Sequence, residues 1–247
     1  MPSNTESELK NSDDDKSINS NFEKHENKKS ITKQAFVGET TEELGSEFKK
    51  AASIAKAIHK TSDEIENGYI GDKVDSSAIE AYAKTNDLWI EDYKSIYENA
   101  NPVAGVESVV YISKDGKHVI KINNGVQHGS WEDFFYRIIA HNTYFPETSY
   151  DLIGYTKRDE KLAVIVKQPF IKIVRGATLA EIKKDLEVFG FEVHSINQAI
   201  DKHNGIILRD LHSENAVIND IGDVIYIDPI IQFIEDSLFL KELKEEL

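Results

Sequence analysis

The sequence contains no cysteine, which excludes disulfide bonds, thiolate metal sites and a cysteine nucleophile. Basic residues are scarce: 29 Lys and Arg stand against 44 Asp and Glu, leaving a formal net charge of −15 at pH 7. That balance disfavours nonspecific binding to nucleic acid and to anionic membrane surfaces. We therefore expect neither nucleic acid nor a membrane among the partners of this chain.

Long apolar runs are also missing, since no stretch approaches the roughly 20 residues of a membrane-spanning helix. The N-terminal stretch MPSNTESELKNSDDDK lacks the basic-then-apolar order of a signal peptide, so we expect a cytoplasmic protein. The 247 residues leave room for one ordinary domain with extensions and can bury a sizeable core.

Two N-terminal regions differ in composition. Residues 1–38 are rich in Ser, Asn, Asp, Glu and Lys, and their few large apolar side chains cannot offset the entropy cost of ordering. We predict a disordered tail there. Residues 39–99 instead carry two capping-box patterns, Thr40-x-x-Glu43 and Ser77-x-x-Glu80, with apolar residues at helical spacing. We predict a helical preface docked on the domain that follows.

The end of this preface has an aromatic stripe. Its members repeat at helical spacing and are Trp89, Tyr93, Ile96 and Tyr97. The stripe fits either a groove for a partner or packing against a core, and we interpret it as core packing.

From residue 101 the apolar period changes to two, which is typical of strands. Val106–Ser113 and His118–Ile122 are predicted strands, and the Asp-Gly pair at 115–116 between them favours a hairpin. Asp151–Tyr155 and Lys161–Val166 are predicted as two further strands. Helices are predicted to begin at Ser130 and at the capping box that starts with Thr178. The pattern indicates an α+β fold.

Residues of types that can bind a metal or take part in catalysis are concentrated in one stretch, residues 205–229, which reads GIILRDLHSENAVINDIGDVIYIDP. An apolar run leads into Asp210 and Asn215, and a predicted hairpin, Ala216–Ile218 with Val224–Ile227, leads into Asp228. Because a hairpin folds the chain back on itself, these three side chains are expected to lie close together. Two carboxylates and an amide form a site suited to Mg²⁺.

This stretch resembles the catalytic loop of protein kinases. Arg209-Asp210-Leu211 is followed by Asn215 five positions after the aspartate, and Asp228 stands where kinases place a metal-binding aspartate. The pattern Asp-x-His-x-x-Asn, which includes His212, is similar to that of aminoglycoside phosphotransferases. The arrangement most resembles the kinase-like domain found in polyvalent proteins of phages and conjugative elements.

Two positions depart from the protein-kinase pattern. Leu208 stands where kinases usually have histidine, and Asp228 is followed by Pro229 instead of Phe-Gly. The residues after Asp228 are also too few for the activation segment and helices of a complete kinase. The resemblance is therefore to the kinase-like fold more than to protein kinases themselves.

The resemblance implies roles in nucleotide binding. In the sequence Val-Ile-Lys, Lys121 matches the phosphate-binding lysine, and on such a strand it faces away from Ile120 and Ile122. Glu132 either pairs with Lys121 or only favours the positive end of its helix. Further positions match the glycine-rich loop (Gly105 for the middle glycine, Ser108 for the last, Val110 for the following valine) and the hinge near adenine (Gln168). A plain β-hairpin explains the loop residues equally well.

The implied cofactors are ATP and Mg²⁺, with Asp210 as catalytic base and Asn215 and Asp228 as metal ligands. The implied architecture is a two-lobe kinase-like domain over residues 100–247. Its N-lobe, about 100–168, would hold an antiparallel sheet, and its C-lobe, about 169–247, would be a reduced helical lobe. A phage or mobile-element origin would place the protein in the bacterial host cytosol.

Three functions are compatible with these residues. The first is an ATP-dependent phosphotransferase acting on a protein or small-molecule hydroxyl, which we favour. The second is a nucleotide-binding pseudokinase that serves as an interaction or regulatory module. The third is an α+β interaction domain that binds no nucleotide. Thermal stabilisation by Mg·ATP separates the first two from the third.

Overall fold

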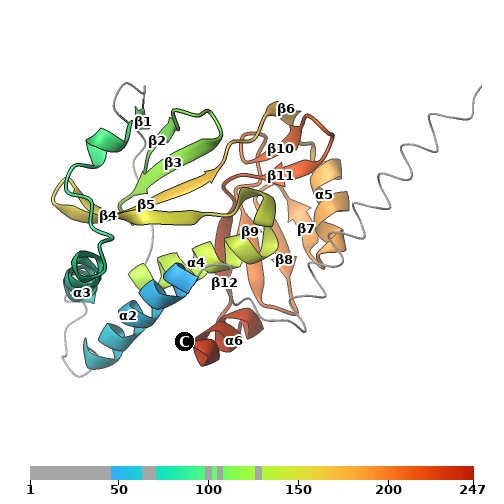
Figure 1. The fold of residues 1–247 in the computed structure, drawn as a ribbon. Helices are drawn as coiled ribbons and strands as arrows, with labels where there is room; N and C mark the ends of the chain where they lie inside the picture. Colours follow the sequence, from blue (N-terminus) through green and yellow to red (C-terminus); the bar gives the residue numbers. More distant parts are fainter. Residues whose placement is uncertain (1–45, 63–70, 98–101, 105–107, 126–129) are drawn as a thin grey trace, which may run out of the picture.

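The computed structural model describes residues 46–62, 71–97, 102–104, 108–125 and 130–247. Within these ranges the chain forms a mixed α+β structure with three antiparallel sheets (Figure 1). None of the helices in these ranges is long and apolar enough to cross a membrane. The predicted tail over residues 1–38, the Thr40 capping box and Gly105 lie outside the described residues.

The first sheet has five strands in the order β1-β2-β3-β5-β4. Their bounds are β1 Val103–Ala104, β2 Ser108–Ile112, β3 His118–Asn123, β4 Asp151–Arg158 and β5 Lys161–Pro169. The β2–β3 turn contains Gly116 at φ +68°, a left-handed conformation that glycine adopts without steric cost. The hairpin predicted at the Asp-Gly pair is therefore confirmed as β2–β3, and the two further predicted strands are present as β4 and β5.

The two faces of this sheet bury different partners. Ile120 and Ile122 of β3 belong to an apolar cluster on one face, which Tyr93 and Ile96 of the short 3₁₀ helix η1 (Tyr93–Tyr97) cover. Lys121 points to the opposite face, as the strand alternation predicts. That second face looks toward helix α4, which lies across it (Figure 1).

Helix α4 (Trp131–Tyr144) begins where the sequence predicts, because the Ser130 side chain accepts a hydrogen bond from the backbone N–H of Asp133 at 3.0 Å. Its outer side packs against α2 (Ser46–Ser62), and the rings of Phe48 and Phe135 lie 6.4 Å apart. In Figure 1, α2 runs beside α4, with the C-terminal helix α6 (Leu238–Glu246) close by. The docked helical preface is thus present in its described part.

The preface differs in detail from the prediction. The Ser77 box does not start a helix, because Ser77 lies inside α3 (Gly71–Thr85). The stripe from Trp89 to Tyr97 forms only η1, because the chain before it runs extended along β4. There the Ile90 N–H donates to the Tyr155 carbonyl at 2.8 Å, and the Tyr155 N–H donates to the Leu88 carbonyl at 2.8 Å.

The second half of the chain contains two smaller sheets, β11-β10-β6 and β12-β9-β8-β7. The strands are β6 Ile173–Gly176, β7 Glu192–Ser195, β8 Gln198–Asp201, β9 Ile206–Arg209, β10 Ala216–Asn219, β11 Val224–Tyr226 and β12 Ile230–Phe233. Helix α5 (Leu179–Val188) has both hydrogen bonds of the capping box predicted at Thr178. The predicted hairpin before Asp228 is confirmed as β10–β11.

The expectation of a helical second half is wrong. Between residues 169 and 247 strands predominate, and the helices described there are α5 and α6. Ile230–Phe233 pairs with β9, and α6 begins after its N-cap, Ser237. Short β-prone runs separated by tight turns, such as β7 and β8, satisfy their backbone groups more readily in hairpins than in a helix.

We expect the Phe48→Ala variant to lose about 3–5 kcal/mol of unfolding free energy, because a fully buried aromatic ring is replaced by a cavity. Phe48 is 2% exposed and packs against α4. Urea denaturation measures the loss, and Lys50→Ala on the exposed side of α2 is the matched control, expected within about 0.5 kcal/mol of the parent. Equal midpoints for both variants would show that α2 does not stabilise the fold.

Candidate active site

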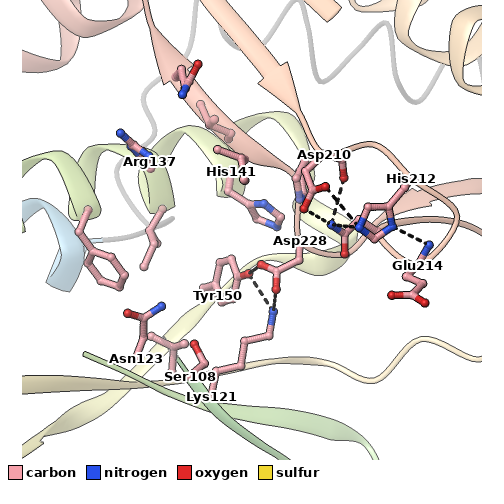
Figure 2. A pocket seen from close by; sticks show the side chains of 18 residues that line it. Ser108, Lys121, Asn123, Arg137, His141, Tyr150, Asp210, His212, Glu214 and Asp228 are labelled. Carbon is pink, nitrogen blue, oxygen red and sulfur yellow. Dashed lines mark hydrogen bonds and ion pairs between the residues drawn. The ribbon is translucent and has the colours of Figure 1, made fainter. Parts of the chain in front are cut away.

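A cavity of about 580 Å³ lies between the five-stranded sheet, α4 and the loops that follow β9 and β11 (Figure 2). Its volume is in the range of small-molecule sites. The lining residues are Ser108, Lys121, Asn123, Phe134, Arg137, Ile138, His141, Tyr150, Val166, Asp210, His212, Glu214, Asn215, Asp228, Pro229, Ile230, Ile231 and Gln232. Four of the residues that the sequence singled out, Lys121, Asp210, Asn215 and Asp228, thus share one cavity.

Lys121 and Asp228 meet at the centre of the cavity although 107 residues separate them in the chain. The Lys121 ammonium donates to Asp228 Oδ2 at 2.9 Å and to the Tyr150 hydroxyl at 3.1 Å. The Tyr150 hydroxyl in turn donates to Asp228 Oδ1 at 2.8 Å. These three side chains form a closed triangle of hydrogen bonds, visible in Figure 2.

The charge state of Asp228 follows from this triangle. Burial acts to raise the pKa of Asp228, but the positive charge of Lys121 and the hydrogen bonds from Lys121 and Tyr150 outweigh it. The pKa of the carboxyl therefore lies below its ordinary value, and Asp228 is ionised at neutral pH. Its side chain remains 56% exposed because it opens onto the cavity, so an ionised oxygen faces the space where a ligand would bind.

The loop after β9 holds Asp210, His212 and Asn215 together. The Asn215 amide nitrogen donates to the Asp210 carbonyl at 3.0 Å and to Asp210 Oδ2 at 2.9 Å. His212 Nδ1 accepts from the backbone N–H of Glu214 at 3.2 Å, which leaves Nε2 as the donor toward Asp210 Oδ1, 3.3 Å away. Asp210 has φ +62°, a left-handed conformation that aspartate tolerates better than most residues.

A buried network fixes the position of Tyr150. The side-chain amide of Asn142 in α4 makes two hydrogen bonds to the backbone of Tyr150. Its oxygen accepts from the Tyr150 N–H at 2.7 Å, and its nitrogen donates to the Tyr150 carbonyl at 2.8 Å. His141, next to Asn142, donates from Nε2 to the Thr148 carbonyl at 3.0 Å. Burial lowers the pKa of His141 to about 4, so this imidazole is neutral at physiological pH.

The side chain of Gln168 belongs to the same network. Its side chain is 1% exposed, and its amide nitrogen donates to the carbonyls of Thr148 at 2.7 Å and Ile227 at 2.8 Å. Gln168 is the penultimate residue of β5 and is not among the described residues that line the cavity. Its side-chain amide connects β5 to Ile227, the residue just before Asp228, and the predicted backbone contact of this position with adenine stays a prediction.

Glu132 does not form the pair with Lys121 that was one of its two predicted alternatives, and its place in the first turn of α4 fits the other. Its carboxylate accepts from the Tyr136 hydroxyl at 2.6 Å and lies 3.9 Å from the ammonium of Lys244 in α6. Glu132 and Lys121, both in the described part of the chain, do not pair. Nine residues separate Glu132 from His141, which at about 100° per residue is about two and a half turns of the helix. The two side chains therefore lie on opposite sides of α4. Since His141 faces the cavity, Glu132 faces the opposite side, toward α2 and α6.

The residues matched to the glycine-rich loop have mixed outcomes. Ser108 lines the cavity at the start of β2. Val110 lies directly opposite Lys121 in the β2–β3 register, so it shares that face of the sheet without belonging to the described cavity lining. Gly105 is outside the described residues.

Several cavity residues carried no recognisable motif. Tyr150 and Arg137 belong to no pattern that marks chemistry, and neither does Asn142, which holds Tyr150 from outside the cavity lining. Only the cavity-facing row of α4, with Phe134, Ile138 and His141, has a helical spacing that the sequence could reveal. The adjacent row, with Phe135 and Ile139, packs on α2 and the core.

The oxygen donors of the cavity fit a hard divalent cation held jointly by protein and phosphate. The amide nitrogen of Asn215 is engaged by Asp210, so its carbonyl oxygen remains as the ligand atom, and Asp228 contributes an ionised carboxylate. Among the described residues, no three His, Cys, Asp or Glu side chains are grouped closely enough to hold a metal alone. This donor set suits Mg²⁺, which keeps few protein ligands and binds substrate phosphates.

The cavity between the sheet and α4 contains the pair of Lys121 with Asp228, next to the loop that carries Asp210 and Asn215. This combination is typical of the kinase-like class of proteins. Sequence comparison gives the particular family: residues 72–235, more than half of the chain, match the serine/threonine/tyrosine kinase found in polyvalent proteins. The chain belongs to this family. No curated protein gave a significant match.

Proposed function

We propose that this protein is an ATP- and Mg²⁺-dependent phosphotransferase that transfers the γ-phosphoryl group to a hydroxyl of a protein or small molecule. The observation that carries the proposal is the 2.9 Å contact between Lys121 and Asp228 in the cavity that also contains Asp210 and Asn215. Family membership supports it, because the family is one of kinases.

The proposed architecture has two lobes on either side of the cavity. The five-stranded sheet and α4 are the N-lobe, at about residues 100–168, and the two smaller sheets with α5 and α6 are the C-lobe, at about 169–247. Together they form the catalytic body, residues 100–247, on which the preface helices dock. The family match starts at residue 72 and so includes α3, which supports an integral role for this part of the preface.

Each proposed catalytic residue has a role that its surroundings support. Lys121 binds the nucleotide phosphates through its buried ammonium, and Ser108, which lines the same cavity at the start of β2, is proposed to contact them as well. Asn215 and Asp228 hold Mg²⁺ through oxygen atoms. When bound, the metal supplies positive charge against the charge that develops on the transferred phosphoryl group.

Asp210 orients the acceptor hydroxyl and accepts its proton as the acceptor oxygen bonds to the γ-phosphorus. The bond from that phosphorus to the bridging oxygen breaks, and ADP leaves. Asn215 and His212 both donate toward the Asp210 carboxylate, one to each oxygen, and this fixes the direction in which the carboxylate points. Positioning and charge stabilisation therefore account for most of the proposed catalysis, since the protein forms no covalent bond with the substrate.

We expect Mg·ATP at about 100 times its Kd to stabilise the protein by about 2.7 kcal/mol. For a domain of this size that raises Tm by about 5–10 °C. Differential scanning fluorimetry with Mg·ATP, ATP plus EDTA, and Mg²⁺ alone measures the shift, and transfer of ³²P to a general acceptor or to water measures turnover. A shift without transfer would identify a pseudokinase, and the absence of any shift would refute the proposal.

A further inference from the structure

We propose that the Tyr150 hydroxyl takes the place of the helix carboxylate that normally positions the phosphate-binding lysine in kinases. This inference rests on the proposed function of Lys121 and adds a positioning residue that no motif marks. Three conditions must hold. The carboxylate of Glu132 must be bound elsewhere, another side chain must lie within hydrogen-bond distance of Lys121, and that side chain must be held rigidly.

The usual partner is committed elsewhere. The Glu132 carboxylate accepts from the Tyr136 hydroxyl at 2.6 Å and lies 3.9 Å from the Lys244 ammonium, on the side of α4 that faces away from the cavity. Moving it to Lys121 would need about half a turn of α4 around its axis. Such a rotation would expose Phe135, which is 0% exposed and packs on Phe48 of α2.

Tyr150 meets the requirements of a substitute. Its hydroxyl accepts from the Lys121 ammonium at 3.1 Å and donates to Asp228 Oδ1 at 2.8 Å, so a single group orients both charged partners. The Lys121 ammonium also lies 5.1 Å from the centre of the Tyr150 ring, within the range of a cation–π interaction. A neutral hydroxyl leaves the Lys121 charge less compensated than a second carboxylate would.

The support for Tyr150 is rigid. Asn142 holds its backbone through two hydrogen bonds, of 2.7 and 2.8 Å, and the His141 ring lies 4.7 Å from the Tyr150 ring. Tyr150 itself is 8% exposed. Because Asn142 and His141 belong to α4, the helix still positions the lysine, but through the tyrosine that follows it instead of through its own carboxylate.

The first arm of the test needs no nucleotide, so it stands apart from the proposed function. In ¹H–¹⁵N spectra of lysine ammonium groups, the Lys121 signal, assigned by its loss in Lys121→Met, is expected to be protected from exchange with water. Tyr150→Phe is expected to remove that protection. Glu132→Gln and the control Tyr155→Phe, whose buried hydroxyl has no hydrogen-bond partner among the described residues, are expected to retain it.

The second arm uses Mg·ATP. Tyr150→Phe is expected to lower kcat/KM for ATP by about ten- to a hundredfold, the effect of losing one charge-assisted hydrogen bond, mainly through a higher KM. Tyr155→Phe and Glu132→Gln are expected to stay within about threefold of the parent. Urea midpoints measured on each variant separate a loss of positioning from a loss of folding.

The possible outcomes are distinct. If Glu132→Gln lowers kcat/KM as Lys121→Met does while Tyr150→Phe does not, α4 turns during catalysis and the Tyr150 proposal is wrong. If the Lys121 signal behaves identically in Tyr150→Phe and the parent, the proposal is equally wrong. If the parent neither binds nor turns over Mg·ATP, the proposed function fails, and the spectra alone decide whether Tyr150 positions Lys121.

Discussion

Replacing Asp210 with Asn is expected to lower phosphoryl transfer by about 10²–10⁴-fold, the usual contribution of a positioned general base. The substitution keeps the size of the side chain and one oxygen that can accept from the Asn215 amide. It removes the negative charge that accepts the hydroxyl proton. Because Asp210 is not one of the proposed metal ligands, the thermal shift caused by Mg·ATP should persist.

The measurement pairs ³²P transfer with scanning fluorimetry on the same preparation. Asp220→Asn is the matched control, since it makes the same chemical change in the exposed turn between β10 and β11, where Asp220 lies 3.5 Å from the Lys172 ammonium. Transfer at the parental rate in Asp210→Asn would exclude Asp210 as the base. Loss of the Mg·ATP shift together with transfer would instead place Asp210 in nucleotide or metal binding.

The sequence predicted the local elements that depend on neighbouring residues. The β2–β3 hairpin follows from its Asp-Gly turn, and the starts of α4 and α5 follow from Ser130 and Thr178, whose side chains cap them. The position of Lys121 opposite Ile120 and Ile122 follows from strand alternation alone. These features need no knowledge of the tertiary structure.

The features that failed depend on contacts between distant elements. Which row of α4 faces the cavity is decided by α2, because Phe48 packs on the row that contains Phe135. The direction of the Gln168 side chain, which the sequence did not predict, is decided by carbonyls of Thr148 and Ile227, which come from other segments. Amphipathic spacing identifies which residues of an element are buried but not which other element they contact. The cavity-facing row of α4 and the partners of Gln168 therefore could not be predicted from the local sequence.

The candidate site was predictable as a set of residue types but not as a network. Asp210, Asn215 and Asp228 were found because their order along the chain resembles a known loop, and the structure places all three at one cavity. Tyr150 and Asn142 were missed because their function lies in holding other side chains. Positioning of this kind leaves no fixed spacing in a sequence, since many side chains can supply the same hydrogen bond.

Replacing Lys121 with Met is expected to abolish most of the Mg·ATP stabilisation, because the phosphates lose their buried cationic partner. Methionine retains a linear apolar stem of similar length, so packing against Val166, its neighbour in the β3–β5 register, is largely preserved. Scanning fluorimetry over a Mg·ATP series measures the effect. Lys167→Met on β5, where the ammonium makes only a partly exposed 3.5 Å pair with Asp151, is the matched control and should keep the parental shift.

The same variant makes a second prediction in the absence of nucleotide, on how stability depends on pH. In the parent, the pKa of Asp228 is lowered, so ionised Asp228 contributes stability above the ordinary value of 3.8, and this contribution is lost as the pH falls through the lower folded value. In Lys121→Met, burial acts on Asp228 without the charge that opposed it, so its pKa rises relative to the parent. The variant should therefore be less stable than the parent at neutral pH, by up to about 1 kcal/mol, because solvent screens the partly exposed carboxylate of Asp228.

That deficit should shrink on acidification, because protonation of Asp228 removes the uncompensated charge from the variant before it affects the parent. Urea denaturation of both proteins between pH 7 and pH 4 provides the test. The neutral imidazole of His141 also contributes stability, and this contribution falls in both proteins as the pH falls toward its pKa of about 4. It therefore largely cancels in the difference between the two free energies of unfolding. A deficit that stays constant with pH would show that Lys121 and Asp228 are not electrostatically coupled, and the proposed nucleotide site would lose its central contact.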